Sequence, residues 1–210
     1  MSTEQEFFRQ VMGHFATGVT IVTTASNEGL SGLTVNAFAS VSLDPPLVLI
    51  CVDLKSHTLD YLRASGNFAV NFLTDRQEAL SRCFATTSAE RYEYFCHAPY
   101  HVAATGSPIL DGILAFIDAR IVAEYPGGDH AIFLGQVVAM GAEGMVYYMN
   151  PADKARSTLT DWADSLAIGN NSHAAHIGEE KIPLAYYRGQ YRHLEGHYQR
   201  PSLAYDKVAE

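Results

Sequence analysis

The chain has 210 residues and is acidic, with 14 basic and 23 acidic side chains and a formal net charge of −9 when histidines are neutral. This length suits one domain with a sizeable core, and 48% hydrophobic with 18% charged residues is typical of globular rather than disordered proteins. The negative balance argues against nucleic acid as a partner, because phosphate backbones select basic surfaces.

Neither a membrane segment nor a metal site is expected. No apolar run approaches the roughly 18 residues that a membrane span needs, and the N-terminus lacks a basic region followed by an apolar core. The three cysteines, Cys51, Cys83 and Cys96, have no metal-type spacing, and their odd number argues against a disulfide framework. The sequence therefore predicts a cytoplasmic protein with buried thiols in a reducing compartment, no metal and no membrane contact.

The first elements are a helix and a hairpin. Apolar residues at helical spacing predict a helix over Glu4–Phe15, which Ser2 or Thr3 would cap. A β-branched strand over Val19–Thr24 follows, and the turn signal Asn27–Gly29 leads into the next strand.

The stretch Thr34–Asp53 is the centre of the pattern. Its first half is small and hydroxylated, which would let a flat ligand approach the backbone. Asp44–Pro46 stops this strand, and the apolar run Leu47–Val52 resumes as another. Two strands hinged at a rigid proline turn would bring Thr34–Ser40 beside Cys51–Asp53. The same pattern also fits an ordinary barrel hairpin with small residues at a tight bend.

Shorter elements follow this stretch. We expect a helix over Leu59–Ala64 that Ser56 or Thr58 would cap, a strand over Asn67–Leu73 and a helix over Asp75–Phe84.

The remaining pattern is mostly strand. The aromatic cluster Arg91–Phe95 has no clean periodicity, whereas Leu110–Ala123 and Ala131–Met140 indicate two long strands around a turn at Tyr125–His130. Strands separated by turns, without βαβ alternation, predict a mostly β fold. We expect one antiparallel β-barrel with short flanking helices, in a single domain over residues 1–210.

Five segments occur together in an order that resembles the short-chain flavin reductase family. They are Phe15–Thr24, Thr34–Val48, Ser65–Leu73, Gly127–His130 and Tyr187–Tyr191. Members of this family are FMN-binding split barrels that supply reduced flavin to two-component monooxygenases. The resemblance covers roughly residues 7–140 and 183–194, and implies a Greek-key split barrel, a homodimer and flavin near the dimer interface. Residues 150–181 depart from the family and would form an insertion, with one helix near Ala152–Leu166.

The resemblance turns several polar residues into candidates for binding FMN or FAD. The flavin ring would lie against Thr34, Val35, Asn36, Ala37, Cys51, Val52 and Asp53. The ribityl chain and phosphate would be held by Ser40, Lys55, Ser56 and Thr58, near the N-terminus of a helix. Three further positions, Arg82, Phe84 and Tyr187, are assigned to the cofactor by the resemblance alone. Without it, Ser56 and Thr58 would be read as ordinary helix caps.

His130 is the candidate for the catalytic step. A histidine after a turn is usually a surface residue, but in the family the motif Gly128-Asp129-His130 lies beside the flavin, where nicotinamide stacks. We expect His130 to orient NADH or NADPH, because hydride transfer between two cofactors needs no protein base.

Three functions remain open at this point. The first is an NAD(P)H:flavin oxidoreductase that supplies reduced flavin to a separate oxygenase, and the absence of a Rossmann Gly-rich motif agrees with it. The second is a split-barrel enzyme that uses bound flavin directly on an organic substrate, with the insertion as a lid. The third is a non-catalytic flavin carrier. The choices of FMN or FAD, of NADH or NADPH, and of the oxygenase stay undecided.

Overall fold

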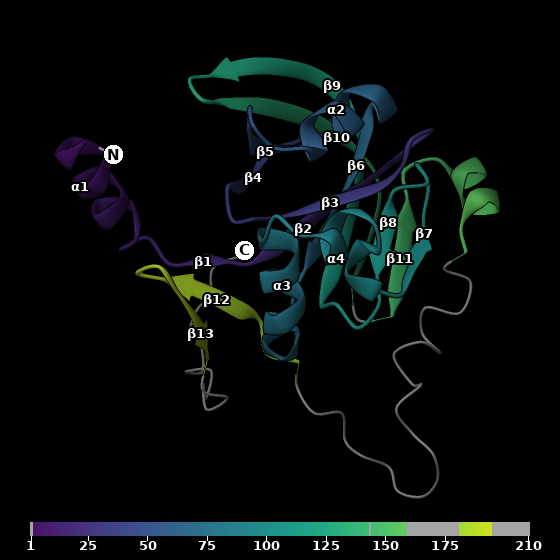
Figure 1. Ribbon diagram of the computed structural model, residues 1–210. Coiled ribbons are helices and arrows are strands. Elements are labelled where there is room, and N and C mark those ends of the chain that lie inside the picture. The colour runs from purple at the N-terminus through teal and green to yellow at the C-terminus, as the bar shows by residue number, and fades with distance from the viewer. Residues whose placement is uncertain (1, 143, 159–180, 195–210) are drawn as a thin grey trace, which may run out of the picture.

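The computed structural model describes residues 2–142, 144–158 and 181–194, and Figure 1 labels their elements. Its main strands are β2 (Thr20–Ser26), β3 (Gly29–Val35), β4 (Phe38–Leu43), β5 (Pro46–Asp53), β6 (Asn67–Phe72), β9 (Ala115–Gly127), β10 (His130–Ala142) and β11 (Met145–Tyr148). The smaller strands are β1 (Thr17–Gly18), β7 (Tyr100–Val102), β8 (Pro108–Leu110), β12 (Leu184–Tyr187) and β13 (Gln190–His193). The helices are α1 (Thr3–Met12), α2 (Thr58–Ser65), α3 (Glu78–Ala85) and α4 (Ala89–Tyr92), with short 3-10 turns η1 (Asp75–Gln77), η2 (Phe95–His97) and η3 (Pro151–Arg156). No helix in these ranges has the length and apolar character needed to cross a membrane.

The main sheet confirms the predicted antiparallel split barrel with short flanking helices. Its strands lie in the order β3-β2-β6-β9-β10-β5-β4, with β11 added beside β10, and every pairing is antiparallel. The two end strands, β3 and β4, are consecutive in the chain and are joined by Asn36–Ala37 alone. The sheet therefore curls back on itself and leaves its split between these two strands (Figure 1).

Apolar cores cover both faces of this sheet. Ile21 and Val22 are neighbours on β2 but belong to different cores, because successive strand residues point to opposite faces. The inner core contains Phe68 and Phe133 and is closed by α2, whereas the outer core packs the sheet against α3, η2 and β8. On β5, however, only the alternate residues Val48, Ile50 and Val52 are buried, all in the inner core, while Leu47, Leu49 and Cys51 on the other face are half-buried.

The predicted first helix and its cap are confirmed with shifted ends. The helix spans Thr3–Met12, and Ser2 caps it by accepting a hydrogen bond from the Gln5 amide, while the Gln5 side chain accepts from the Ser2 amide. None of its residues is buried. In Figure 1 this helix stands away from the barrel and is connected to it through β1.

The long strands differ from the prediction in two places. The strand expected over Leu110–Ala123 is interrupted, because β8 ends at Leu110 and a turn with Gly112 at a φ of 74° precedes β9. The turn expected over Tyr125–His130 shrinks to Gly128–Asp129, since antiparallel pairing continues from β9 into β10 up to the Gly127 and His130 pair. Backbone hydrogen bonding in this hairpin extends the strands beyond what local residue preference predicts.

Two helix predictions are also altered. The helix expected over Asp75–Phe84 begins as the 3-10 turn Asp75–Gln77 before continuing as α3. The helix expected near Ala152–Leu166 is a 3-10 turn over Pro151–Arg156, and the rest of that prediction lies outside the described residues. The insertion over 150–181 and the single domain over 1–210 stay predictions.

The prediction that all three cysteines are free thiols is wrong. Cys83 on α3 and Cys96 in η2 form a disulfide, with their Cα atoms 6.1 Å apart. The chain reverses between these elements, so tertiary packing brings two cysteines together that spacing alone did not pair. Cys51 is the remaining free thiol, and partial burial raises its pKa.

Candidate functional site

A cavity of about 310 Å³ lies where β3, the loop after β5 and the two helices α3 and α4 meet. Its lining residues are Leu33, Thr34, Asp53, Lys55, Ser56, His57, Phe84, Ala85, Thr87, Arg91 and Tyr92. We call this cavity the flavin pocket, for the ligand that the sequence predicts here. Five of the predicted cofactor residues, Thr34, Asp53, Lys55, Ser56 and Phe84, are brought together in its wall.

The loop after β5 folds around its own polar side chains. The Asp53 carboxylate accepts a hydrogen bond from the Lys55 amide at 2.8 Å, and the Asp53 carbonyl accepts one from the Ser56 amide at 2.9 Å. The Ser56 hydroxyl accepts from the amide of Thr58, which opens α2. This local network presents Lys55 and Ser56 at the pocket. The expected cap by Ser56 or Thr58 is wrong, because His57 is the N-cap of α2 and no side chain makes a capping hydrogen bond there.

Arg91 is a pocket residue that the sequence analysis did not single out. Its side chain is buried, its Nε donates to the Gly32 carbonyl at 2.9 Å, and a terminal nitrogen donates to the Thr58 hydroxyl at 3.2 Å. Burial lowers the pKa of this guanidinium, which nevertheless stays charged. Within the described ranges, no carboxylate lies at ion-pair distance from it. A buried positive charge that faces a pocket in this way favours an anionic ligand.

Thr58 lies behind the pocket wall rather than in it. The side chain is fully buried, and its hydroxyl accepts hydrogen bonds from Ser31 and Arg91 and lies 3.4 Å from the Gly32 carbonyl. The residue therefore contacts the guanidinium of Arg91 and is not open to solvent. The sequence around Arg91 has no periodic pattern that would place this residue in a site. The available signal is a short one: Ser88 is a capping residue, and Arg91 follows it by three positions, in the first turn of α4.

The other predicted cofactor residues lie around the flavin pocket or beyond it. Val35 and Val52 are buried in the inner core, Cys51 is half-buried, and Asn36, Ala37 and Ser40 are exposed along the split of the barrel. The Ala37 carbonyl accepts a hydrogen bond from the Cys51 amide at 3.1 Å, so the two halves of the central stretch do lie side by side. Arg82 is on the other side of α3, and Tyr187 packs against His14 and Arg188.

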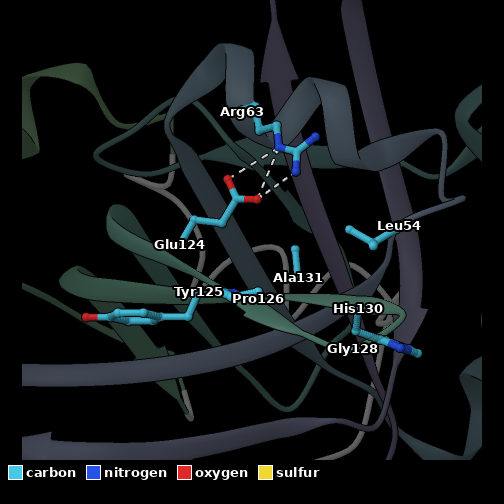
Figure 2. Close-up of a pocket in the computed structure, with 8 residues that line it drawn as sticks. All are labelled: Leu54, Arg63, Glu124, Tyr125, Pro126, Gly128, His130 and Ala131. Atoms are coloured by element: carbon cyan, nitrogen blue, oxygen red, sulfur yellow. Dashed lines mark hydrogen bonds and ion pairs between the residues drawn. The ribbon is translucent and has the colours of Figure 1, made fainter.

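His130 lines a second cavity of about 350 Å³, between α2 and the tip of the β9–β10 hairpin (Figure 2). Its ring is 41% exposed, and Nδ1 lies 2.7 Å from an Asp129 carboxylate oxygen. The hydrogen bond with His130 lowers the pKa of the Asp129 carboxyl group. Across the cavity, the Arg63 guanidinium makes a bidentate ion pair with Glu124, 2.7 Å at the shortest contact.

The two cavities are neighbours on either side of one strand end. Asp53 pairs with His130 in the β5–β10 ladder, and the Leu54 amide donates to the Asp129 carbonyl at 3.0 Å. Leu54 lines the cavity of His130, while Asp53 and Lys55 line the flavin pocket. The fold therefore holds His130 beside the flavin pocket but does not place it in the same wall.

Comparison with known proteins agrees with this architecture. The model of the flavin reductase like domain family matches residues 12–195. The chain is 33% identical over 168 residues to the reductase subunit HsaB of a flavin-dependent monooxygenase from Mycobacterium tuberculosis, covering 76% of this chain and 88% of that one. It is 38% identical over 135 residues to an NADH-dependent flavin reductase from Rhodococcus sp, covering 61% and 72%.

A solved structure shows the same fold. Component B of nitrilotriacetate monooxygenase, a homologue from Mycobacterium thermoresistibile, superposes with a TM-score of 0.73 at 30% identity, covering 99% of this chain and 96% of that one. The split barrel, the pocket residues and these matches lead to one conclusion: the chain belongs to the flavin reductase family.

Proposed function

We propose that this protein is an NAD(P)H:flavin oxidoreductase, with FMN or FAD bound in the flavin pocket and with NADH as the favoured reductant. The main support for this binding site is that the buried Arg91 guanidinium faces a pocket that also contains Lys55 and Ser56. Charged donors of this kind hold a phosphate group. The choice of NADH rests on the name of the related Rhodococcus enzyme.

Each pocket residue has a defined part in this proposal. Arg91 and Lys55 supply positive charge to the flavin phosphate, and the Ser56 hydroxyl supplies a further polar contact. Thr58 and the Gly32 carbonyl fix the guanidinium in place, so Thr58 is a positioning residue rather than a direct ligand. Thr34 and the buried Phe84 ring form the wall for the flavin. Bound flavin accepts a hydride from reduced nicotinamide, which is chemistry that belongs to the two cofactors.

We place the nicotinamide at the mouth of the cavity of His130, which adjoins the flavin pocket across the end of β5. The hydrogen bond that His130 Nδ1 donates to the Asp129 carboxylate holds the imidazole at the tip of the hairpin. There the ring would orient the reductant, and the Leu54 side chain would contribute to the exclusion of water.

The reduced flavin is proposed to pass to a separate oxygenase, because the related HsaB is the reductase subunit of a flavin-dependent monooxygenase. We also propose that the protein acts in the cytoplasm as a homodimer. Support for the dimer is helix α1, whose apolar side chains are all exposed in the isolated chain.

Titration calorimetry with flavins tests the phosphate site. Arg91→Gln should lower the affinity for FMN and FAD by about tenfold or more, because a hydrogen bond to a charged group contributes about 1.5–3 kcal/mol. Riboflavin, which carries no phosphate, is the matched ligand, and its affinity should not change. Equal losses for riboflavin and FMN would instead assign Arg91 a purely structural role.

Stopped-flow reduction tests the reaction. NADH should reduce the bound flavin, and His130→Ala should raise the KM for NADH, or lower the rate of hydride transfer, by roughly tenfold, with flavin affinity nearly unchanged. His101→Ala, a similarly exposed histidine on β7, is the control. Absence of reduction would favour a carrier, and reduced flavin that never leaves the protein would favour an enzyme acting directly on an organic substrate.

A further inference from the structure

A disulfide closes the segment of chain that carries one wall of the flavin pocket. Cys83 lies near the end of α3, and Cys96 lies in η2, 13 residues further along the chain. Between them the chain runs through α4, which contacts both α3 and β3 (Figure 1). We call residues 84–95 the cystine loop. The pocket residues within this loop are Phe84, Ala85, Thr87, Arg91 and Tyr92.

Contacts at the two ends of the cystine loop connect the disulfide to the pocket. Phe95, next to Cys96, is buried, and its ring meets the Phe84 ring edge to face at 5.0 Å. Phe84, next to Cys83, packs so closely on β3 that a Cβ atom at Gly32 would lie 2.8 Å from its ring. Because cores of this density transmit small movements, a shift of either cysteine reaches Phe84 and with it the pocket wall.

The turn around Cys96 has a backbone conformation that needs a restraint. Phe95, Cys96 and His97 have φ values of 50°, 53° and 51°, in the left-handed region that residues with a side chain rarely occupy. Such a conformation persists only where the surrounding structure imposes it. The disulfide restrains the middle residue, whereas the ion pair of His97 with Glu90, at 3.1 Å, is exposed and of a kind that adds little stability. Without the disulfide, this turn should relax.

The disulfide is also within reach of a reductant. Both cysteines are half-buried rather than enclosed in the core. In the cytoplasm, which we propose for this protein, thiol pools keep most cysteines reduced, so a disulfide there is usually transient, catalytic or redox-sensing. A disulfide that closes the wall of a ligand pocket suits a redox-sensing role.

We propose that Cys83 and Cys96 form a reversible redox site that controls how tightly the flavin pocket holds its ligand. The disulfide form keeps Phe84 and Arg91 in place and retains flavin. The dithiol form lets the cystine loop leave this arrangement part of the time, so that flavin is released more readily. The inference goes beyond the proposed function and rests on it, because it requires flavin in this pocket.

A dithiol reductant opens the site. One thiolate of the reductant attacks a cysteine sulfur and forms a mixed disulfide, and the second thiol of the reductant then displaces that cysteine. In total, the bond between Cys83 and Cys96 gains two electrons and two protons and becomes two thiols, while the reductant becomes a disulfide.

Hydrogen peroxide closes the site. Reduced flavin that meets dioxygen instead of an oxygenase gives it two electrons and two protons, which yields oxidised flavin and hydrogen peroxide. One cysteine thiolate attacks the peroxide to give a sulfenic acid and hydroxide, and the other thiol then displaces water from that sulfur. The hydroxide takes up the proton of the first thiol, so two thiols and one peroxide become one disulfide and two waters. The closed form retains flavin, and the peroxide therefore limits the side reaction that produced it.

Titration calorimetry with FMN, on protein of defined thiol state, tests the proposal. The disulfide form should bind FMN about tenfold more tightly than protein that has been reduced with dithiothreitol and desalted without oxygen, as for a loop that spends about a tenth of its time in the binding arrangement. The double variant Cys83→Ser with Cys96→Ser should bind FMN like reduced wild type, with or without dithiothreitol. It retains Cys51, so it also controls for an effect of the reductant on that thiol.

Counting free thiols measures reversibility. The disulfide form should have one free thiol, that of Cys51, and the reduced form three, and one equivalent of hydrogen peroxide should restore both the single thiol and the tight binding of FMN. The proposal is overturned if both forms bind FMN equally, if peroxide does not close the site, or if dithiothreitol opens the disulfide only in unfolded protein. Loss of the folded state on reduction, seen by circular dichroism, would also overturn it and would make the disulfide purely structural.

Failure of the proposed function looks different. The site would still open and close, but neither form would bind FMN or reduce it with NADH.

Discussion

Asp118 is a fully buried carboxyl group on β9, on the opposite side of the sheet from the barrel interior. Its oxygens accept hydrogen bonds from the amides of Ala104 and Thr105, at 2.8 and 2.9 Å, and from the Thr105 hydroxyl. Burial raises its pKa from 3.8 to about 6, despite these donors, which favour the ionised form. The residue therefore anchors the loop after β7 with a carboxyl group that titrates near neutral pH.

This raised pKa predicts how stability depends on pH. Between pH 4 and 6 the folded state holds a proton on Asp118 that the unfolded state has released, so the contribution of this group to the free energy of unfolding falls as pH rises. The loss approaches about 3 kcal/mol above pH 6, the equivalent of the shift from 3.8 to about 6. Urea unfolding of wild type and Asp118→Asn, measured from pH 4 to 7.5, tests this. The free energy of unfolding of wild type minus that of the variant should fall by about 3 kcal/mol over this range. A difference that is constant with pH would contradict the shifted pKa.

At the scale of elements, the barrel depends on close approach between strands and side chains of the inner core. Gly135 on β10 faces the Phe68 ring, and a Cβ atom at this position would lie 2.5 Å from the ring carbon Cζ. Gly135→Ala should therefore lower the free energy of unfolding by roughly 1–3 kcal/mol, the range for overpacked cores. Gly18→Ala on β1 is the matched control, because its Cβ would meet nothing within 4 Å.

Chemical denaturation measures both variants. Phe68→Leu should recover part of the loss in the Gly135→Ala background, since the smaller side chain makes room for the new methyl group. Equal stabilities of the two single variants would show that β10 shifts freely against β6 and that the close approach is not required.

At the scale of the whole molecule, the exposed helix α1 is the feature that points to a partner. It has ten residues, none of them buried, and isolated helices of this length are only marginally stable in water. Phe7 and Phe8 are 66% and 67% exposed, Val11 and Met12 continue the same apolar face, and Phe15, just after the helix, is exposed as well. On β4, Leu43 is also almost fully exposed. Surfaces of this kind are covered by a partner, for which we propose a second copy of this chain.

Light scattering at micromolar concentration should therefore give twice the chain mass of 23.0 kDa. Phe8→Asp, which places a charge on the apolar face, should weaken the dimer by roughly tenfold or more. Gln10→Asp makes a similar charge change on the opposite face of the same helix and should leave the mass unchanged. A monomeric mass for wild type would refute the dimer.

Local patterns in the sequence determined most of the fold. Ser2 and Gln5 form a capping box, Asn27–Gly29 turns the first hairpin, and Asp44 and Pro45 separate β4 from β5, because each residue type limits the backbone within a few positions. The order of five motifs identified the family. For the site, four of the residues that the sequence proposes for the cofactor, Thr34, Asp53, Lys55 and Ser56, line one cavity, and their role in binding stays a prediction.

The tertiary structure alone decided which distant groups meet. It joined Cys83 to Cys96, placed Arg91 against Gly32 and Thr58, and moved Thr58 behind the wall that it was expected to form. It also set the Tyr187–Tyr191 segment beside α3, which created a cavity that neither segment has by itself. These outcomes depend on the packing of elements far apart in the chain, and burial and charge compensation at such contacts have no signature within a few residues of sequence.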